Sequence, residues 1–259
     1  MKYICPDCGK QYESGMFCQE CGTKLQETAP ELVCPFCGYK STTGKFCPEC
    51  GSNLKEHNSI LTLNGHEYVD LGLSVKWATM NIGATRPEEY GDYFAWGETK
   101  PKSDYSLSTY KYGNSIKNIN KYCTDRFYGY RFFKDNKTIL DPEDDAAHVN
   151  WGGDWRMPTK EEQDELCENC TWTWTTLNGV NGYKVQSKKI GYTDKWIFLP
   201  AAGNYDMSML ENEGDGHYLS SSLYADAPCF AYSLLFQSGD VDREYTCRDM
   251  GWSVRPVCL

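Results

Sequence analysis

Two copies of one cysteine pattern occupy the first 54 residues of the chain. The sequence CPDCGKQYESGMFCQECG begins at Cys5, and CPFCGYKSTTGKFCPECG begins 29 positions later, at Cys34. At this offset, residues 3–25 and 32–54 are identical at 11 of 23 positions, including all eight cysteines. The chain therefore contains an internal duplication, and each copy has to fold around its own cysteines.

Each copy places two C-x-x-C-G elements nine residues apart, which is enough chain for a tight hairpin that returns the second cysteine pair to the first. Four soft thiolates then form a closed tetrahedral site for one zinc ion. A unit of about twenty residues is too short for a hydrophobic core, so metal binding must supply most of its folding free energy. We therefore expect two structural Zn²⁺ ions. Their predicted ligands are Cys5, Cys8, Cys18 and Cys21 in a first ribbon (residues 1–27), and Cys34, Cys37, Cys47 and Cys50 in a second ribbon (residues 31–55).

The duplicated pattern resembles the double zinc ribbons of many bacterial proteins, in which such modules serve as structural or partner-docking elements. Both four-cysteine sets are complete, so neither leaves the open coordination position that a catalytic zinc needs. Residues 1–54 hold five Lys, no Arg and six acids, and the whole chain has a formal net charge of −10. Because phosphate binding depends mainly on Lys and Arg, we expect no nucleic-acid partner.

The use of cysteine favours a reducing compartment. Eight of the fourteen cysteines form C-x-x-C pairs in the metal motifs, and the N-terminal sequence MKYICPDCGK lacks the apolar segment of a secretory signal. No apolar run reaches the roughly 18 residues that cross a bilayer. We therefore expect a cytoplasmic protein without membrane insertion.

Residues 60–259 have a different composition, with short apolar runs separated by glycine turns. Thr159 and Glu162 form a capping-box pattern that predicts a helix over residues 160–169. Two further helices are expected over residues 85–98 and 141–150. Strands are expected over residues 66–72, 75–81, 171–177, 182–188, 196–203, 217–223, 229–237, 241–247 and 251–258. Two or three helices followed by antiparallel strands indicate an α+β domain. The polar, tyrosine-rich residues 100–135 give no pattern that assigns an element.

Several motifs of this large domain occur in the same order as in a known family. They are EYVDLGLSVKWATMNIG, YGDYFAWGE, WGGDWRMPTKEEQDEL, FLPAAG, YLSSS and GWSVRPV, within residues 66–257. The domain resembles the Fibrobacter succinogenes major paralogous domain, which is abundant in Bacteroidetes proteins. This resemblance implies a C-type-lectin-like fold, related to that of the formylglycine-generating enzyme, that displays a ligand-binding surface and has no general catalytic activity. Family members are commonly exported or lipid-anchored, and this chain departs from them because it begins with thiolate zinc sites.

A strand period of two divides the segment CFAYSLLFQ (229–237) into two faces. Every second residue from Phe230 to Phe236 would face the core, and every second residue from Cys229 to Gln237 would face outward. After the Ser238-Gly239 turn, aromatic and apolar residues mix irregularly with acids, which is typical of a recognition surface. The predicted ligand-binding residues are Cys229, Phe230, Ser233, Leu235, Gln237, Asp240, Asp242, Glu244, Tyr245, Thr246, Asp249, Met250 and Trp252.

A second resemblance concerns the layout of this segment. Diversity-generating retroelements rewrite codons near the C-terminus of target proteins with a C-type-lectin-like fold, just before a constant terminal segment. The irregular stretch from Cys229 to Trp252 ends at SVRPV, which is similar to that layout. The resemblance implies a variable protein with a diversified hairpin surface, and the alternative is a family member with an ordinary surface.

Together these patterns predict a non-enzymatic ligand-binding protein, with a protein as its ligand and with structural zinc ribbons for tethering or docking. The sequence leaves homo-oligomerisation open. One alternative is a copper oxidase of the formylglycine-generating type, for which Cys247 and Cys258 are the candidate ligands, although their spacing departs from that of the enzyme. Another alternative is an adaptor whose ribbons dock a partner while the large domain only displays.

Other residues carry structural expectations. Cys167 and Cys170 end the capped helix without a second pair, which favours simple packing over a redox pair or a zinc half-site. Arg156 and Arg255 are expected to satisfy buried carboxylates or carbonyls. The acidic loop over residues 211–217 lacks the spacing of a calcium loop and is expected to be a solvated turn.

Overall fold

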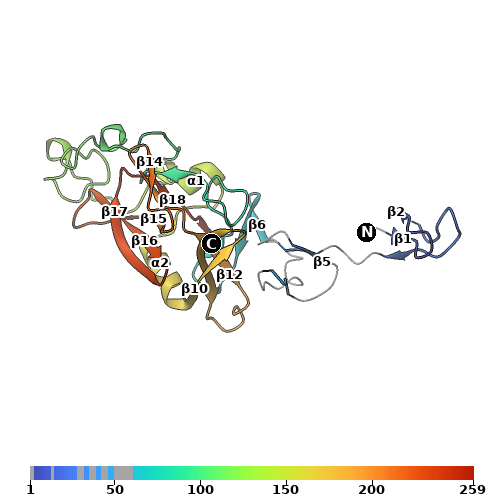
Figure 1. The fold of residues 1–259 in the computed structure, drawn as a ribbon. Helices are drawn as coiled ribbons and strands as arrows, with labels where there is room; N and C mark the ends of the chain where they lie inside the picture. Colours follow the sequence, from blue (N-terminus) through green and yellow to red (C-terminus); the bar gives the residue numbers. More distant parts are fainter. Residues whose placement is uncertain (1–2, 13–14, 28–31, 35–38, 42–45, 50–60) are drawn as a thin grey trace. The chain divides into compact units, whose positions relative to one another are not determined.

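The structure is a computed structural model of the chain, and it describes residues 3–12, 15–27, 32–34, 39–41, 46–49 and 61–259. The chain divides into two compact units, Met1–Ser59 and Ile60–Leu259. Strands dominate the described part of both units, and the described helices lie in the second unit (Figure 1). No helix in the described part of the chain is long and apolar enough to cross a membrane.

The first unit contains two small strand pairings. β1 (Tyr3–Ile4) pairs antiparallel with both β2 (Gln11–Tyr12) and β3 (Gln26–Glu27). β4 (Leu32–Val33) pairs antiparallel with β5 (Lys40–Ser41), and these strands follow β1 and β2 by 29 residues. The sequence duplication is therefore also a duplication of local structure in the described residues.

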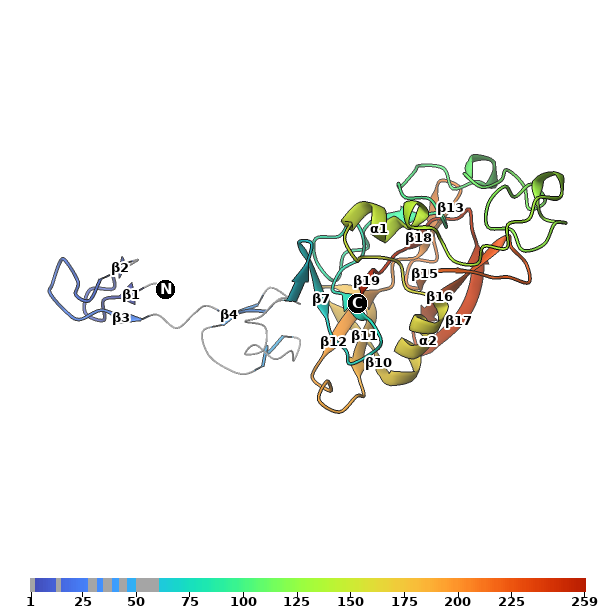
Figure 2. The same ribbon diagram turned by 180° about the vertical axis from the view of Figure 1, so that it is seen from behind.

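Most of the second unit is built on three sheets and a hairpin. The largest sheet has the strand order β17 (Asp240–Cys247), β16 (Phe230–Gln237), β15 (Gly216–Leu223), β18 (Trp252–Ser253) and β9 (Tyr93–Phe94). A four-stranded sheet has the order β19 (Val257–Cys258), β8 (Lys76–Ala78), β7 (His66–Val69) and β6 (Leu61–Leu63). A three-stranded sheet contains β10 (Cys170–Leu177), β11 (Val180–Ser187) and β12 (Trp196–Pro200), and a two-stranded hairpin contains β13 (Asn204–Asp206) and β14 (Met209–Glu211). β17 is an edge strand, and Figures 1 and 2 show it beside β16 along one side of this unit.

The helices of the second unit are short. They are the α-helices α1 (Ala146–Trp151) and α2 (Lys160–Asn169) and the 3₁₀ turns η2 (Leu107–Thr109), η3 (Tyr130–Phe132) and η4 (Pro142–Asp144). The second unit is thus a mixed fold with mostly β-sheet and few helices.

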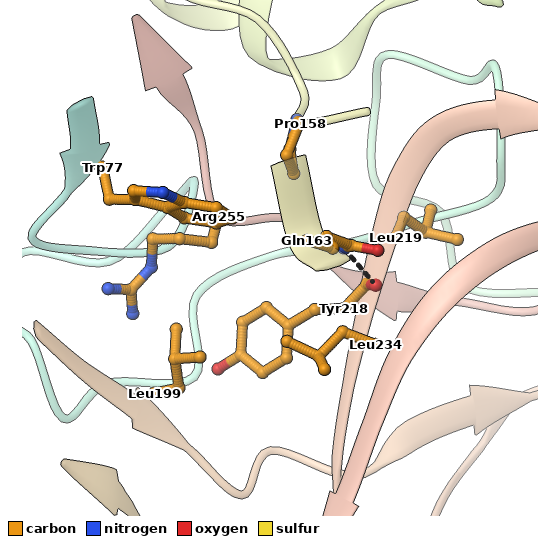
Figure 3. Close-up of a pocket in the computed structure, with 8 residues that line it drawn as sticks. All are labelled: Trp77, Pro158, Gln163, Leu199, Tyr218, Leu219, Leu234 and Arg255. Atoms are coloured by element: carbon orange, nitrogen blue, oxygen red, sulfur yellow. Dashed lines mark hydrogen bonds between the residues drawn. The ribbon is translucent and has the colours of Figure 1, made fainter. Parts of the chain in front are cut away.

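The predicted helix over residues 160–169 is confirmed as α2. The N–H of Glu162 donates to Thr159 Oγ1 at 3.3 Å, and the N–H of Thr159 donates to Glu162 Oε2 at 2.8 Å, which completes the capping box. Arg156 donates to both oxygens of the same carboxylate, at 2.5 and 2.7 Å, as expected for a satisfied carboxylate. Gln163 Nε2 donates to the carbonyl of Tyr218 at 3.0 Å, so α2 is also tied to β15 (Figure 3).

The side chains around Gln163 belong to the core. Figure 3 shows the eight residues of this hollow, and the space between them admits no water-sized molecule. Arg255 lines it with 1% of its surface exposed and donates to the carbonyls of Ala78, Thr79 and Phe198 and to Asn81 Oδ1, at 2.9 to 3.1 Å. The expectation that Arg255 satisfies buried carbonyls is confirmed.

The predicted helix over residues 85–98 is wrong, because this segment forms turns that lead into β9. Glu89 Oε2 accepts hydrogen bonds from the N–H groups of Thr85 and Arg86, at 2.7 and 3.2 Å. A side chain thus satisfies these N–H groups within a local turn. Gly91 has a φ of +73°, and a Cβ there would lie 2.2 Å from the carbonyl oxygen of Ile82. The chain reverses so tightly at Gly91 that a helix cannot continue through it.

The helix predicted over residues 141–150 begins later, because α1 spans Ala146–Trp151. Asp145 has an extended backbone, with φ −86° and ψ 114°, and its side chain accepts hydrogen bonds from the N–H groups of Ala147 and His148. Asp145 is therefore the N-cap of α1, and it divides the predicted helix into η4 and α1.

The unassigned residues 100–135 contribute buried tyrosines to the core. Tyr105, Tyr110, Tyr112 and Tyr122 each expose 7% of their surface or less. The Tyr110 hydroxyl donates to the carbonyl of Trp96 at 2.7 Å, and the Tyr105 hydroxyl donates to a main-chain carbonyl in β9 at 2.5 Å. These tyrosines do not follow a helical or strand period, which is why periodicity assigns no element to the segment.

Cys167 and Cys170 act as packing residues. Burial raises the pKa of Cys167 to about 12 and that of Cys170 to about 11. Cys170 is 1% exposed and belongs to the same apolar core as Leu166. Both thiols stay protonated near neutral pH, which favours the packing interpretation over a redox pair.

Candidate metal centre and candidate binding surface

The four cysteine sulfurs of the first ribbon lie within 4.8 Å of one another. Cys5 Sγ is 3.4 Å from Cys21 Sγ, and Cys8 Sγ is 3.5 Å from Cys18 Sγ. In a tetrahedral site with Zn–S bonds of about 2.3 Å, the sulfurs stand about 3.8 Å apart. The four sulfurs therefore fit one tetrahedral Zn²⁺ ion after a small expansion.

A neighbouring tyrosine favours the thiolate form of Cys18. Tyr12 Oη and Cys18 Sγ share a hydrogen bond at 3.1 Å, which is the main cause that lowers the pKa of Cys18 to about 6. Gly9 and Gly22 follow their cysteine pairs with φ values of +73° and +74°. This left-handed conformation is open to glycine and allows the tight turn on which each cysteine pair sits.

Only part of the second ribbon lies among the described residues. Cys34 and Cys47 are buried, with 0% and 1% of their surface exposed, and Cys37 and Cys50 lie outside the described residues. The N–H of Cys34 forms the same turn hydrogen bond as the N–H of Cys5, 29 residues earlier. The second zinc ion remains a prediction.

The predicted ligand-binding residues lie on β16, β17 and the segment that follows them. β17 pairs with β16 from the turn, at Gln237↔Asp240, to the open end, at Phe230↔Cys247. Residues 242–245 of β17 are all exposed, so both faces of this edge strand are open to solvent there. The half-buried members of the predicted set are Cys229, Phe230, Leu235, Thr246, Asp249 and Met250.

Two of the predicted residues are buried, so their placement on the binding face is wrong. Ser233 exposes 6% of its surface and Trp252 exposes 5%. The pairing of β15 with β16 shifts register between Leu219 and Leu223, and both Ser233 and Leu234 are buried, so the alternation expected for β16 fails there. Trp252 lies on β18 inside the five-stranded sheet, and its indole N–H donates to a main-chain carbonyl at 2.9 Å.

Four aromatic side chains form a cluster, which we call the aromatic cluster. Three of them, Phe230, Tyr232 and Tyr245, lie on the hairpin, and the fourth is Tyr224. Tyr224 stacks on Tyr245 with ring centroids 4.3 Å apart and meets Tyr232 edge-on at 5.4 Å. The ring centroids of Phe230 and Tyr245 are 5.2 Å apart, and 46% of the surface of Tyr245 is exposed. Phe230 and Tyr232 are only half-buried, so the expectation that they point into the core is wrong. Sequence reasoning missed Tyr224, because it lies in the turn after β15.

A pocket of about 280 Å³ opens at the turn end of the hairpin, and we call it the acidic pocket. Its lining residues are Asn212, Asp215, His217, Leu235, Phe236, Gln237, Asp240 and Asp242. Four of them, Leu235, Gln237, Asp240 and Asp242, belong to the set predicted from the sequence. The lining holds three carboxylates and neither Lys nor Arg, so its charge favours a cationic group of a ligand.

The acidic loop over residues 211–217 takes part in this pocket and is not only a solvated turn. Asp215 lines the pocket, and His217 pairs directly with Leu235 of β16. This pairing joins segments that are far apart in the sequence, and no local pattern marks the two residues as neighbours.

A pH dependence of stability follows from His217. Its Nε2 has no hydrogen-bond partner in the described part of the chain, and burial lowers its pKa to about 4. His217 lines the acidic pocket together with Asp215, Asp240 and Asp242, and the centroid of its ring lies 5.1 Å from that of Trp252. Histidine in an unfolded chain binds a proton near pH 6.5, so unfolding takes up a proton between about pH 6.5 and 4. This contribution to stability is therefore lost as the pH falls through that window.

We expect the substitution His217→Asn to flatten the pH dependence of the free energy of unfolding between about pH 6.5 and 4, by about 2 to 3 kcal/mol. Urea denaturation at a series of pH values measures this difference. At pH 8 neither His217 nor the asparagine that replaces it is charged. The difference in free energy of unfolding between the two proteins at this pH therefore reports packing alone. An identical acid slope in both proteins would contradict the prediction.

A smaller, mostly apolar pocket of about 70 Å³ lies at the open end of the hairpin. Residues 107–119 form one side of it, and Cys229, Phe230, Cys247 and Asp249 form part of the other. The structure thus divides the predicted set between two ends of one hairpin, an acidic end and an apolar end.

The two cysteines of the copper alternative lie in different sheets. Cys247 ends β17 in the five-stranded sheet, and Cys258 lies on β19 in the four-stranded sheet. Burial raises the pKa of Cys247 to about 11 and also raises the pKa of Cys258. Burial thus disfavours the thiolate form of both residues.

Comparison with known proteins bears on the first unit. Residues 5–57 match a family model described as Double zinc ribbon. No curated protein and no solved structure matches the chain significantly. The family match covers the four cysteines whose sulfurs lie within 4.8 Å of one another. The N-terminal unit is therefore a zinc ribbon region that binds zinc.

Proposed function

We propose that this protein is a non-enzymatic ligand-binding protein, in which a C-type-lectin-like second unit presents the β16–β17 hairpin to a protein ligand. The motifs within residues 66–257 support the fold assignment by their resemblance and their order. The strand-rich second unit with few helices is compatible with it. The zinc ribbons serve as the tether or as a docking module.

The observation that carries this proposal is the exposed edge strand β17. Its residues 242–245 are all exposed, while its neighbour β16 holds buried residues such as Leu234 and Phe236. A ligand can therefore contact β17 side chains that the core does not need. Exposed substitutions away from buried contacts usually change stability by less than about 0.5 kcal/mol, so such positions tolerate exchange.

The chemistry of the hairpin indicates what kind of ligand it receives. The aromatic cluster offers a large, rigid contact area, as in many protein-recognition surfaces. The acidic pocket at the turn end of the hairpin favours a basic side chain of the partner. Both features are compatible with a surface diversified by a retroelement, with the exchanged positions confined to exposed residues such as Asp242, Glu244 and Tyr245.

The proposal predicts that a ligand contacts Tyr245. A photoreactive phenylalanine analogue placed at position 245 of the full-length chain is expected to crosslink the ligand in extracts of the cells that express the protein. The matched control position is Ile190, which is 98% exposed and lies outside the hairpin. For the ligand identified in this way, Tyr245→Ala and Asp242→Ala should each weaken affinity about tenfold, and Ile190→Ala should have no effect. Full affinity in both hairpin variants, with unchanged melting temperature, would refute the placement of the site.

A second function, partner docking through the ribbons, is favoured by the family match over residues 5–57. The two functions can be separated because residues 60–259 form a compact unit of their own. Deletion of residues 1–59 should leave the affinity of the hairpin ligand unchanged. If the deletion abolishes binding of that ligand, the ribbons are the main docking site.

A further inference from the structure

A strongly basic segment stands out in this acidic protein. Residues 115–139 contain six cations, Lys117, Lys121, Arg126, Arg131, Lys134 and Lys137, and only two acids. The segment has a net charge of +4, whereas the chain has a formal net charge of −10. Its yellow-green trace, which includes η3, lies at the periphery of the second unit in both views (Figures 1 and 2). We call it the basic loop.

The basic loop also exposes large apolar side chains. Ile116, Phe127, Tyr130 and Phe132 expose 53%, 65%, 48% and 71% of their surface. Single exposed apolar residues are common on soluble proteins, but several in one short segment mark a contact surface. Apolar and cationic residues thus occur together in one exposed segment.

Hydrogen bonds within the loop fix its conformation. The carboxylate of Asp135 accepts hydrogen bonds from the N–H groups of Tyr122 and Cys123, both at 2.8 Å, and closes the base of the loop. The N–H of Ile119 donates to the carbonyl of Tyr128, which joins the two arms. Gly129 allows a close approach, because a Cβ there would lie 1.9 Å from the carbonyl oxygen of Phe133. The exposed side chains therefore sit on a preformed support.

The backbone at the tip of the loop is strained. Arg131 and Phe132 have φ values of +49° and +66°. A bulky aromatic residue at positive φ is a genuine outlier, and such strain persists where the surrounding structure enforces it, often at functional positions. This strained backbone places the exposed side chain of Phe132 at the tip of the basic loop.

Most of the loop's positive charge is free to meet a ligand. Lys121 and Lys137 pair with Asp141, at 2.7 and 2.5 Å. The other four cations of the loop make no ion pair with any described residue. The Arg126 guanidinium lies 5.4 Å from the ring of Phe127, and that of Arg131 lies 5.0 Å from the ring of Tyr130, so positive charge and apolar surface are adjacent.

We propose that the basic loop binds the surface of an anionic lipid bilayer. Exposed aromatic and aliphatic side chains can enter the boundary between head groups and acyl chains, while neighbouring Lys and Arg meet the anionic head groups. Transfer of the aliphatic Ile116 side chain from water to a hydrocarbon environment is favourable. Proteins that bind single-stranded nucleic acid instead stack bases on aromatic rings, and Ile116 has no ring for such stacking. The contact is reversible and peripheral, and at Ile116 it adjoins the apolar pocket at the open end of the hairpin.

The test is co-sedimentation of the full-length protein with vesicles. We expect binding to vesicles of phosphatidylcholine mixed with phosphatidylserine, and little binding to pure phosphatidylcholine. The double variant Arg126→Gln, Arg131→Gln should lower the partition coefficient about twentyfold. The double variant Phe127→Ser, Phe132→Asn should lower it at least about tenfold. Asparagine is chosen at position 132 because it tolerates positive φ.

Matched controls separate the loop from general surface effects. Ile190→Ser removes an exposed apolar residue elsewhere, and Lys100→Gln with Lys188→Gln removes two exposed cations elsewhere. These controls should bind anionic vesicles like the wild type. Absence of vesicle binding, or equal binding by the loop variants and the wild type, overturns the proposal. Loop-dependent binding to poly(U) RNA without vesicle binding would overturn it in favour of a nucleic-acid site.

Discussion

The substitution Cys18→Ser is expected to abolish zinc binding by the first ribbon and to unfold residues 3–27, while residues 60–259 keep their folding transition. Cys18 is 3% exposed and is one of four sulfurs grouped within 4.8 Å. The ribbon core consists of Cys5, Cys18 and Leu25, with Tyr3 and Tyr12 packed against them. Zinc binding to such units corresponds to about 10 to 16 kcal/mol, far more than so small a core can replace.

Metal analysis of the full-length protein, purified without chelator, measures the zinc content, and hydrogen exchange measures protection of residues 3–27. We expect the variant to hold one zinc ion fewer than the wild type and to lose protection in this segment. Cys167→Ser is the control, because Cys167 lies on α2 and outside the metal motifs. An unchanged zinc content in Cys18→Ser would show that Cys18 is not a ligand.

The features that the sequence predicted well are those set by neighbouring residues. The spacing of Cys5, Cys8, Cys18 and Cys21 defines a metal site within a single short hairpin, and the capping box at Thr159 defines the start of α2. In both cases all interacting groups lie within about twenty residues. Local spacing is then enough to fix local geometry.

Features that depend on distant partners were predicted less well. The burial of Ser233 follows from an irregular register with β15, and the burial of Trp252 follows from the position of β18 inside the sheet. His217 reaches the acidic pocket through its pairing with Leu235. A strand period of two cannot reveal a register shift, because the shift is decided between strands.

The turn at residues 85–98 shows a different limit. Thr85 followed by Pro87 matches the start signal of a helix, but Glu89 caps the N–H groups in a local turn and Gly91 reverses the chain. The same residue types serve both as helix caps and as turn formers. The close contact between Gly91 and Ile82, nine residues earlier, decides between the two outcomes, and neither a helix period nor a strand period reveals it.

The second large loss of stability is expected from substitution of Arg248. This residue lies inside the irregular stretch from Cys229 to Trp252, but its side chain belongs to the core. It is 2% exposed. Its guanidinium donates to the Tyr110 hydroxyl and to the carbonyls of Lys121, Tyr122 and Pro228, at 2.6 to 3.1 Å, and lies 4.6 Å from the Trp96 ring. These contacts join the end of β17 to the tyrosine-rich segment, which has no regular secondary structure of its own there.

We therefore expect Arg248→Ala to lower the free energy of unfolding of the second unit by about 4 kcal/mol. The substitution leaves three buried carbonyl oxygens and one hydroxyl without their donor, and each unsatisfied group costs about 1 to 3 kcal/mol. It also leaves a cavity beside Trp96. Urea denaturation of the full-length protein, followed by tryptophan fluorescence, measures the loss.

Two further variants separate the causes and test what the hairpin can tolerate. Arg248→Met restores most of the side-chain volume, so any remaining loss reports the hydrogen bonds. Arg243→Ala is the matched control, because Arg243 lies on the same strand with its side chain 46% exposed, and removal of exposed charge pairs costs at most about 1 kcal/mol. Equal stability of Arg248→Ala and Arg243→Ala would mean that the buried guanidinium does not hold the hairpin base. We expect instead that Arg248→Ala is much less stable than Arg243→Ala. Any diversification of residues 229–252 must then leave Arg248 unchanged, because exposed side chains of β17 can be exchanged only while buried contacts hold the strand in place.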